Sequence, residues 1–285
     1  MLNSKTQPSS SRQDSLDLAC EATSSSSVVP SSNIASHSLG KSRRSAAVFL
    51  PGTLCDAQVF APQIQALCAN SINTLVVDFG QANTLQKMLD ALELQLKNSG
   101  YLHITLVAFS MGAMVAFELL RQSKKYVFSI EQLILISSNA LSDSPQKAKM
   151  RQQHLAIARN TSIGSLVANT YMPNYLYKQH IGHQHIIVGM AESLGINVFV
   201  NQLAVLAQRP DSSAQLKALR MRCCIVAGRQ DVLCPVDEQL RMLEAAKLSH
   251  QAVELVILEE CGHFASLEQA QHINQLLLSR ISTQP

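Results

Sequence analysis

From about residue 46, the hydrophobic residues of this 285-residue chain alternate between short apolar runs and stretches with helical spacing. Four apolar runs are short enough to be buried strands: Ala46–Leu50, Asn73–Phe79, His103–Phe109 and Gln132–Ser137. Helical spacing separates these runs, over Val59–Ala69, Leu85–Leu96 and Met111–Gln122. Strands that alternate with helices predict an α/β fold, with a mostly parallel central sheet flanked by helices.

The alternation stops after the fourth strand and resumes later. Residues 144–219 show only helical patterns and loops. The strand and helix pattern then returns over Cys223–Val226, Val236–Ala246, Val253–Leu258 and Ala265–Ile281. An insertion of roughly 70 residues in an α/β core is usually functional, so we expect a helical lid over a site at 144–219.

The first part of the chain has a different composition. Residues 1–45 contain fifteen serines and almost no apolar periodicity. Such a segment buries too little apolar surface to offset its ordering entropy, so we expect residues 1–44 to be a disordered tail and 45–285 the folded domain. The tail lacks the basic patch and the apolar stretch of about 7–15 residues of a secretory signal, which favours a cytoplasmic location.

Composition excludes several classes of protein. The chain is 47% hydrophobic, 15% charged and carries a net charge of +3, so it lacks the basic field of a nucleic-acid-binding protein. It has no run of about 18 uncharged apolar residues, which argues against a membrane-spanning helix. The seven cysteines form no C-x-x-C pair, which indicates free thiols in a reducing compartment and no cysteine zinc site.

Ser110 has the surroundings of a nucleophile. It follows the strand His103–Phe109 directly and precedes the helix Met111–Gln122. A tight turn there projects the hydroxyl above the sheet, and the helix N-terminus faces negative charge that forms nearby. The backbones nearly touch at this turn, which requires small residues two positions away; Gly112 meets that need, and Ala108 adds only one methyl.

Two further residues follow strands in the same way. His263 lies in a glycine-containing loop after Val253–Leu258, where it is placed to accept and return the Ser110 proton. Asp231 follows Cys223–Val226 and is our choice for the carboxylate that orients the imidazole. Asp143, after Gln132–Ser137, is the alternative acid.

An oxyanion that forms on the substrate also needs amide donors. One is expected to be the backbone N–H of Met111, next to the nucleophile. The other is expected from the loop after the first strand, with Thr53 N–H as our choice and Leu54 N–H as the second. Gly52 would let this loop approach the substrate closely.

Four motifs in order resemble the α/β-hydrolase superfamily: FLPGTLCD, VAFSMGA, AGRQDVLCP and EECGHFASLEQ. The resemblance covers about residues 45–281 and includes the chain order of serine, acid and histidine. It implies the α/β-hydrolase fold and a serine hydrolase, with Ser110 where the dehalogenase and epoxide-hydrolase branches carry aspartate. The stretch Arg209–Ser212 also resembles small bacterial carboxylesterases, some of which cleave the methyl ester of pimeloyl-acyl-carrier protein in biotin synthesis.

The expected lid is basic. Residues 144–191 contain no Asp or Glu but five cations: Lys147, Lys149, Arg151, Arg159 and Lys178. Such a surface attracts an anionic partner, and the resemblance suggests an acyl carrier protein docked by the first four. The alternative is a solvated helix face.

No metal or cofactor is expected. His180, His183 and His185 have no cysteine or carboxylate nearby in the sequence that would complete a metal site. Apolar residues of the lid, such as Tyr171, Tyr175 and Phe199, either line an acyl pocket or pack the lid.

These observations predict a serine carboxylesterase that works through an acyl-enzyme. Three alternatives stay open. A thioesterase or lactonase would use the same three residues, as would a lyase or carbon–carbon hydrolase. A non-catalytic binding protein of the same fold would not need them intact.

Overall fold

The computed structural model describes residues 44–122, 126–248 and 252–281. The expected tail, residues 1–44, lies outside the described residues except for Arg44. These residues contain a single sheet. Its strands lie at the apolar runs that the sequence predicts to be strands.

The sheet has six strands in the order β2-β1-β3-β4-β5-β6, and every neighbouring pair is parallel. The strands are β1 (Ser45–Leu50), β2 (Asn73–Val76), β3 (His103–Phe109), β4 (Ser129–Ile136), β5 (Arg222–Gly228) and β6 (Val253–Leu258). The predicted α/β fold with a parallel central sheet is therefore confirmed. Because the strands are parallel, their carboxyl ends share one edge of the sheet, and the loops that leave them meet there.

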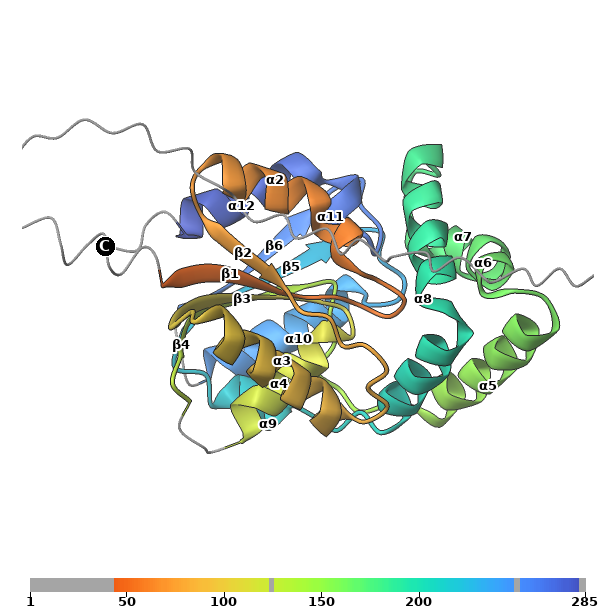
Figure 1. Cartoon of the computed structure of the whole chain (residues 1–285), viewed down its shortest axis with the longest axis horizontal. Coiled ribbons are helices and arrows are strands. Elements are labelled where there is room, and N and C mark those ends of the chain that lie inside the picture. The colour runs from red at the N-terminus through yellow and green to blue at the C-terminus, as the bar shows by residue number, and fades with distance from the viewer. Residues whose placement is uncertain (1–43, 123–125, 249–251, 282–285) are drawn as a thin grey trace, which may run out of the picture. The chain divides into compact units, whose positions relative to one another are not determined.

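Helices cover both faces of the sheet (Figure 1). On one side lie η1 (Ala57–Phe60), α2 (Ala61–Ala69), α11 (Ala265–Glu268) and α12 (Ala270–Ile281). On the other lie α3 (Leu85–Ser99), α4 (Gly112–Arg121), α9 (Ser213–Lys217) and α10 (Val236–Lys247). Successive strand side chains enter opposite cores, as Phe49 and Val107 do on the first side and Val48 and Leu106 on the second.

The segment between β4 and β5 is helical, as the sequence predicts for 144–219. It contains α5 (Pro145–Asn160), α6 (Ile163–Leu166), the π-helical turn η2 (Val167–Tyr171), α7 (Met172–Tyr175) and α8 (Ile181–Ala207), followed by α9. We call α5 to α8 with η2 the insertion helices, because α9 already packs against α4 and α10 of the core. They lie beside the carboxyl ends of the strands (Figure 1).

Helix α8 is broken at Gly195, whose φ of 76° and ψ of 175° are not helical. Figure 1 shows the two pieces at an angle to each other. Helix α8 is long enough to span a membrane, and an 18-residue window within it has a mean hydropathy of 1.4, with 39% of that window buried. The sequence-based exclusion of such a helix therefore does not hold on length and composition, although neither piece alone reaches the ~20 residues that a span needs.

Replacing Gly195 with alanine is expected to lower the free energy of unfolding by about 1–3 kcal/mol, since this combination of φ and ψ is accessible essentially only to glycine. Apart from the adjacent residues and the helix's own backbone, no atom lies within 4 Å of a Cβ built there, so the cost comes from the backbone conformation. Urea unfolding measures the change. The matched control is Gly189→Ala on the same helix, where a Cβ also meets nothing and alanine should stabilise by up to about 1 kcal/mol. Equal effects of the two substitutions would contradict the backbone explanation.

Candidate active site

Ser110 occupies the turn between β3 and α4. Its φ of 51° is in the left-handed region, which a non-glycine residue rarely adopts, and the Ser110 N–H donates to the Ile136 carbonyl at 3.0 Å. A Cβ at Gly112 would lie 2.2 Å from the Leu50 carbonyl oxygen, so only glycine lets α4 approach β1 this closely. The small residue that the sequence analysis required after Ser110 is thus needed by packing, and Ala108 fits fully buried.

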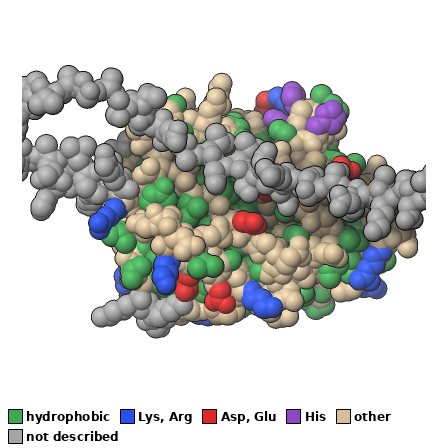
Figure 2. Space-filling view, in the orientation of Figure 1, with side chains coloured by type: hydrophobic (Ala, Val, Ile, Leu, Met, Phe, Trp, Pro, Cys, Tyr) green, Lys and Arg blue, Asp and Glu red, His purple; other side chains and the backbone are tan. Residues whose placement is uncertain are grey.

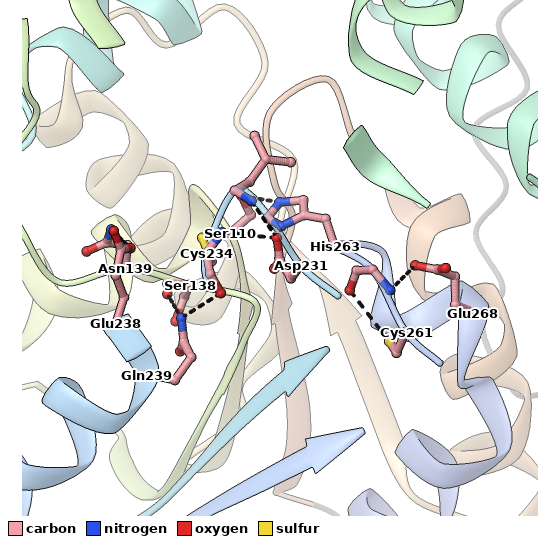
Figure 3. A network of polar contacts seen from close by, with 12 residues as sticks. Ser110, Ser138, Asn139, Asp231, Cys234, Glu238, Gln239, Cys261, His263 and Glu268 are labelled. Carbon is pink, nitrogen blue, oxygen red and sulfur yellow. Dashed lines mark hydrogen bonds and ion pairs between the residues drawn. The ribbon is translucent and has the colours of Figure 1, made fainter. Parts of the chain in front are cut away.

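His263 lies in the loop after β6, and its ring faces Ser110 (Figure 3). The His263 Nε2 atom is 3.0 Å from the Ser110 Oγ atom. The His263 backbone N–H donates to the Tyr175 carbonyl at 2.8 Å, and the Tyr175 ring stacks on the imidazole with centroids 6.1 Å apart. The ring is therefore held from the insertion side as well as from its own loop.

Asp231 follows β5 and lies at the ring nitrogen of His263 that does not face Ser110 (Figure 3). The His263 Nδ1 atom is 2.9 Å from the Asp231 Oδ2 atom, while the N–H groups of Leu233 and Cys234 donate to Oδ1 at 2.9 and 3.0 Å. Burial raises the pKa of the Asp231 carboxyl, but His263 and these donors oppose burial and leave the pKa below its ordinary value. The carboxylate is therefore ionised at neutral pH, which favours the proton on Nδ1 and leaves Nε2 free to accept.

The alternative acid is engaged elsewhere. Asp143 forms ion pairs with Arg151 and Arg209, and its side chain is 8% exposed. The structure brings Ser110, His263 and Asp231 together and assigns Asp143 to the arginine cluster. Of the four basic residues expected to dock a partner, Arg151 is only 12% exposed and pairs with Asp143.

Two amides near Ser110 are open for an oxyanion. Among the described residues, no group accepts a hydrogen bond from the N–H of Thr53 or of Met111. Leu54, our second choice, is not open, because its N–H donates to the Gln202 Oε1 atom at 2.8 Å. A Cβ at Gly52 would lie 2.9 Å from the Phe109 ring and 3.2 Å from the Ser110 Cβ, so glycine is what lets this loop approach the nucleophile. The geometry favours Thr53 and Met111 as the donor pair.

Two side chains that hydrogen-bond loops of the site could not be found from the sequence. The Glu268 carboxylate accepts hydrogen bonds from Gly262 N–H at 3.0 Å and Tyr177 N–H at 2.7 Å, and so joins the histidine loop to the insertion helices. Burial raises the pKa of this carboxyl. Gln202 lies on α8, far along the chain from Leu54. The only sequence signal for Glu268 was its place five residues after His263, and Gln202 had none.

Histidine side chains gather on the surface at the start of α8, where His180, His183 and His185 lie (Figure 2). The rings of His180 and His183 have centroids 4.7 Å apart. The pKa of His183 is lowered, mainly by burial and to a smaller extent by the neighbouring His180. A second cluster of residue types that can bind metals consists of Asp231, Cys234 and His263, whose potential ligand atoms all lie within 4.8 Å of one another. Both oxygens of Asp231 already accept hydrogen bonds in that group, which suits proton transfer better than a metal ion.

Ser110 lies in a strand–turn–helix at the carboxyl edge of a parallel sheet, and His263 and Asp231 lie at the same edge. This arrangement is typical of hydrolases with a serine, a histidine and an acid. The chain belongs to the alpha/beta hydrolase family, whose model matches residues 47–273.

Solved structures with this fold include esterases. A thermophilic esterase from Thermogutta terrifontis superposes with a TM-score of 0.70 at 22% identity, covering 84% of this chain and 89% of that one. An esterase from Exiguobacterium antarcticum gives a TM-score of 0.74 at 16% identity, covering 84% and 92%. At these identities, the superpositions show the fold alone.

The sequence also resembles a 2-hydroxy-6-oxononadienedioate/2-hydroxy-6-oxononatrienedioate hydrolase of Escherichia coli, with 39% identity over 72 residues. That match spans 25% of this chain and 24% of the relative, about a quarter of the length of each.

Proposed function

We propose that this protein is a serine carboxylesterase that cleaves an ester through an acyl-enzyme. The observation that carries the proposal is the continuous hydrogen-bond chain from Ser110 Oγ through both nitrogens of His263 to Asp231, at 3.0 and 2.9 Å. A non-catalytic binding protein has no need for this alignment or for a strained serine with φ of 51°.

Each group has one role in the proposed reaction. As Ser110 Oγ attacks the ester carbon, His263 Nε2 takes its proton, and Asp231 stabilises the imidazolium that forms. The Thr53 and Met111 N–H groups donate to the carbonyl oxygen as it becomes negative. Collapse of the tetrahedral intermediate breaks the bond to the alcohol, which leaves with the proton of His263. A water molecule then repeats the sequence on the acyl-enzyme and releases the carboxylic acid and Ser110.

The test has two parts. Labelling by a fluorophosphonate, blocked by Ser110→Ala, is expected from an activated serine and not from a scaffold of the same fold. A panel of p-nitrophenyl esters, acyl-CoA thioesters, lactones and acyl-carrier methyl esters then ranks the leaving groups by kcat/KM. Preference for a thioester or lactone would replace the esterase proposal by the corresponding alternative. The name of the Escherichia coli relative describes a dicarboxylate, so 2-hydroxy-6-oxo diacids belong in the same panel as a carbon–carbon hydrolase test.

The finer proposal is that the physiological ester is carried by an acidic acyl carrier protein, as in pimeloyl methyl ester cleavage for biotin synthesis. It is supported by the charge of helix α5, where Lys149 and Arg159 are exposed and Lys147 is half-buried. Arg151 is left out of the docking set because Asp143 pairs with it. A cytoplasmic location fits a carrier-bound substrate, and it is supported by the six described cysteines, all free thiols.

Reversing Lys149 and Arg159 to glutamate is expected to lower kcat/KM for the carrier-bound ester by about 10-fold or more at low salt, and to flatten its salt dependence, because long-range attraction mainly sets the association rate. Hydrolysis of a small neutral ester should change little. Stopped-flow or initial-rate assays at several ionic strengths measure both. The matched control reverses Lys87 and Lys97 on α3, which changes the net charge equally. Equal losses for both substrates would refute docking through α5.

A further inference from the structure

The buried side chain of Gln202 joins the insertion helices to the loop that carries a proposed oxyanion donor. Gln202 lies in the second piece of α8 and is 4% exposed. Its Oε1 atom accepts the Leu54 N–H at 2.8 Å. These residues are 148 positions apart in sequence, so the contact exists only because α8 folds over the carboxyl ends of the strands.

The loop needs this support, because Leu54 is held in an uncommon conformation. The Cys55 N–H donates to the Gly52 carbonyl at 3.3 Å and closes a four-residue turn. Leu54 is the third residue of that turn and has a φ of 54°, where such turns strongly favour glycine. A leucine persists there only when its surroundings hold it, and the Gln202 acceptor fixes the peptide plane between Thr53 and Leu54.

Both pieces of α8 touch the same loop. The Met190 sulfur lies 3.5 Å from the Asp56 nitrogen, in contact with its N–H, and Gln202 holds Leu54 two residues earlier. In a straight helix the two side chains would be about 18 Å apart along the axis, whereas Leu54 and Asp56 are separated by at most about 7 Å. The break at Gly195 brings both pieces to one short loop.

We propose that Gln202 is a positioning residue for catalysis, which holds the Leu54 turn so that the Thr53 N–H is aimed at the forming oxyanion. This rests on the proposed serine hydrolase mechanism. Without the acceptor, Leu54 relaxes toward negative φ and the Thr53 amide moves. A displacement of about 1 Å in a catalytic group costs about 10²-fold in rate, so the contact makes the oxyanion site depend on the position of α8.

The direct test is Gln202→Leu, which keeps the volume and removes the acceptor. We expect kcat for a p-nitrophenyl ester to fall by about 10- to 100-fold with KM changed by less than about 3-fold, because the donor acts on the transition state. Affinity for a trifluoromethyl ketone, whose adduct with Ser110 places an oxyanion at the same donors, should fall in parallel with kcat/KM. A role in packing alone would not link these two quantities.

Two further variants separate positioning from loss of stability. In a Leu54→Gly background, glycine adopts the positive φ unaided, so adding Gln202→Leu should lower kcat by less than about 3-fold. Gln63→Leu is the matched control, because Gln63 is another fully buried glutamine, whose Nε2 donates to the Ser266 carbonyl at 3.0 Å. It should lower the melting temperature and leave kcat unchanged.

The outcomes decide between explanations. Unchanged kcat and unchanged ketone affinity in Gln202→Leu, with a melting temperature lowered as in Gln63→Leu, would overturn the proposal. So would equal kcat losses from Gln202→Leu in the wild-type and Leu54→Gly backgrounds. A wild-type protein that neither reacts with a fluorophosphonate nor cleaves any compound in the panel would instead refute the proposed function.

Discussion

Ser110→Ala is expected to lower kcat/KM for an ester substrate by about 10⁴-fold or more, because the nucleophile and its base act as a unit. Apart from His263, no described group bonds the Ser110 hydroxyl. The free energy of unfolding should therefore change by no more than about 1.5 kcal/mol, the net contribution of one hydrogen bond. Initial rates and urea unfolding of the same preparation measure the two quantities.

The matched control for this loss is Ser266→Ala. Ser266 is fully buried, and its hydroxyl has no hydrogen-bond partner among the described residues. Its replacement should leave kcat/KM within about 3-fold of wild type. Turnover by Ser110→Ala at the wild-type rate would mean that the serine assignment is wrong, however well the fold is preserved.

Asp231→Asn is expected to lower kcat by about 10³- to 10⁴-fold. The wild-type carboxylate accepts from Nδ1–H of His263, which leaves Nε2 unprotonated and able to take the Ser110 proton. An amide nitrogen at the same place donates to Nδ1 instead and stabilises the opposite tautomer. The pH–rate profile of the residual activity and direct NMR observation of the His263 ring protons would report this change.

Asp143→Asn tests the same assignment from the other side. Asp143 contacts Arg151 and Arg209, so its replacement leaves buried guanidinium groups less well paired and should reduce stability. Its effect on kcat should be less than about 5-fold, because Asp143 makes no contact with the imidazole. The reverse ranking, with Asp143→Asn the more damaging to kcat, would move the acid to the loop after β4.

Much of the architecture could be predicted from the sequence because the signals are local. The strands His103–Phe109 and Val253–Leu258 have the predicted bounds, since a short apolar run between turn residues specifies a buried strand without help from distant segments. Ser110 stood out for the same reason: a strand, a turn with Gly112 and a helix are adjacent in the chain. The positions of His263 and Asp231 after strands followed from the parallel topology.

The remaining features depend on contacts between distant parts of the chain. The sequence left Asp231 and Asp143 as alternatives, and only the packing of β5 beside β4 and the arginines of the insertion segment separates them. It ranked Thr53 before Leu54 without a decisive reason, which the Gln202 contact now supplies. The catalytic roles themselves stay predictions until the substitutions are made.

By itself, the sequence determined the α/β layers, the serine turn and the edge of the sheet at which a reaction is expected, because periodicity, turn chemistry and strand direction are properties of neighbouring residues. Only the tertiary structure decided which acid faces His263, which amides stay open and how α8 bends at Gly195 to reach the Leu54 loop. Those outcomes depend on side chains and amides that compete for the same partners in space, and residues 148 positions apart carry no local signal of the contact they make.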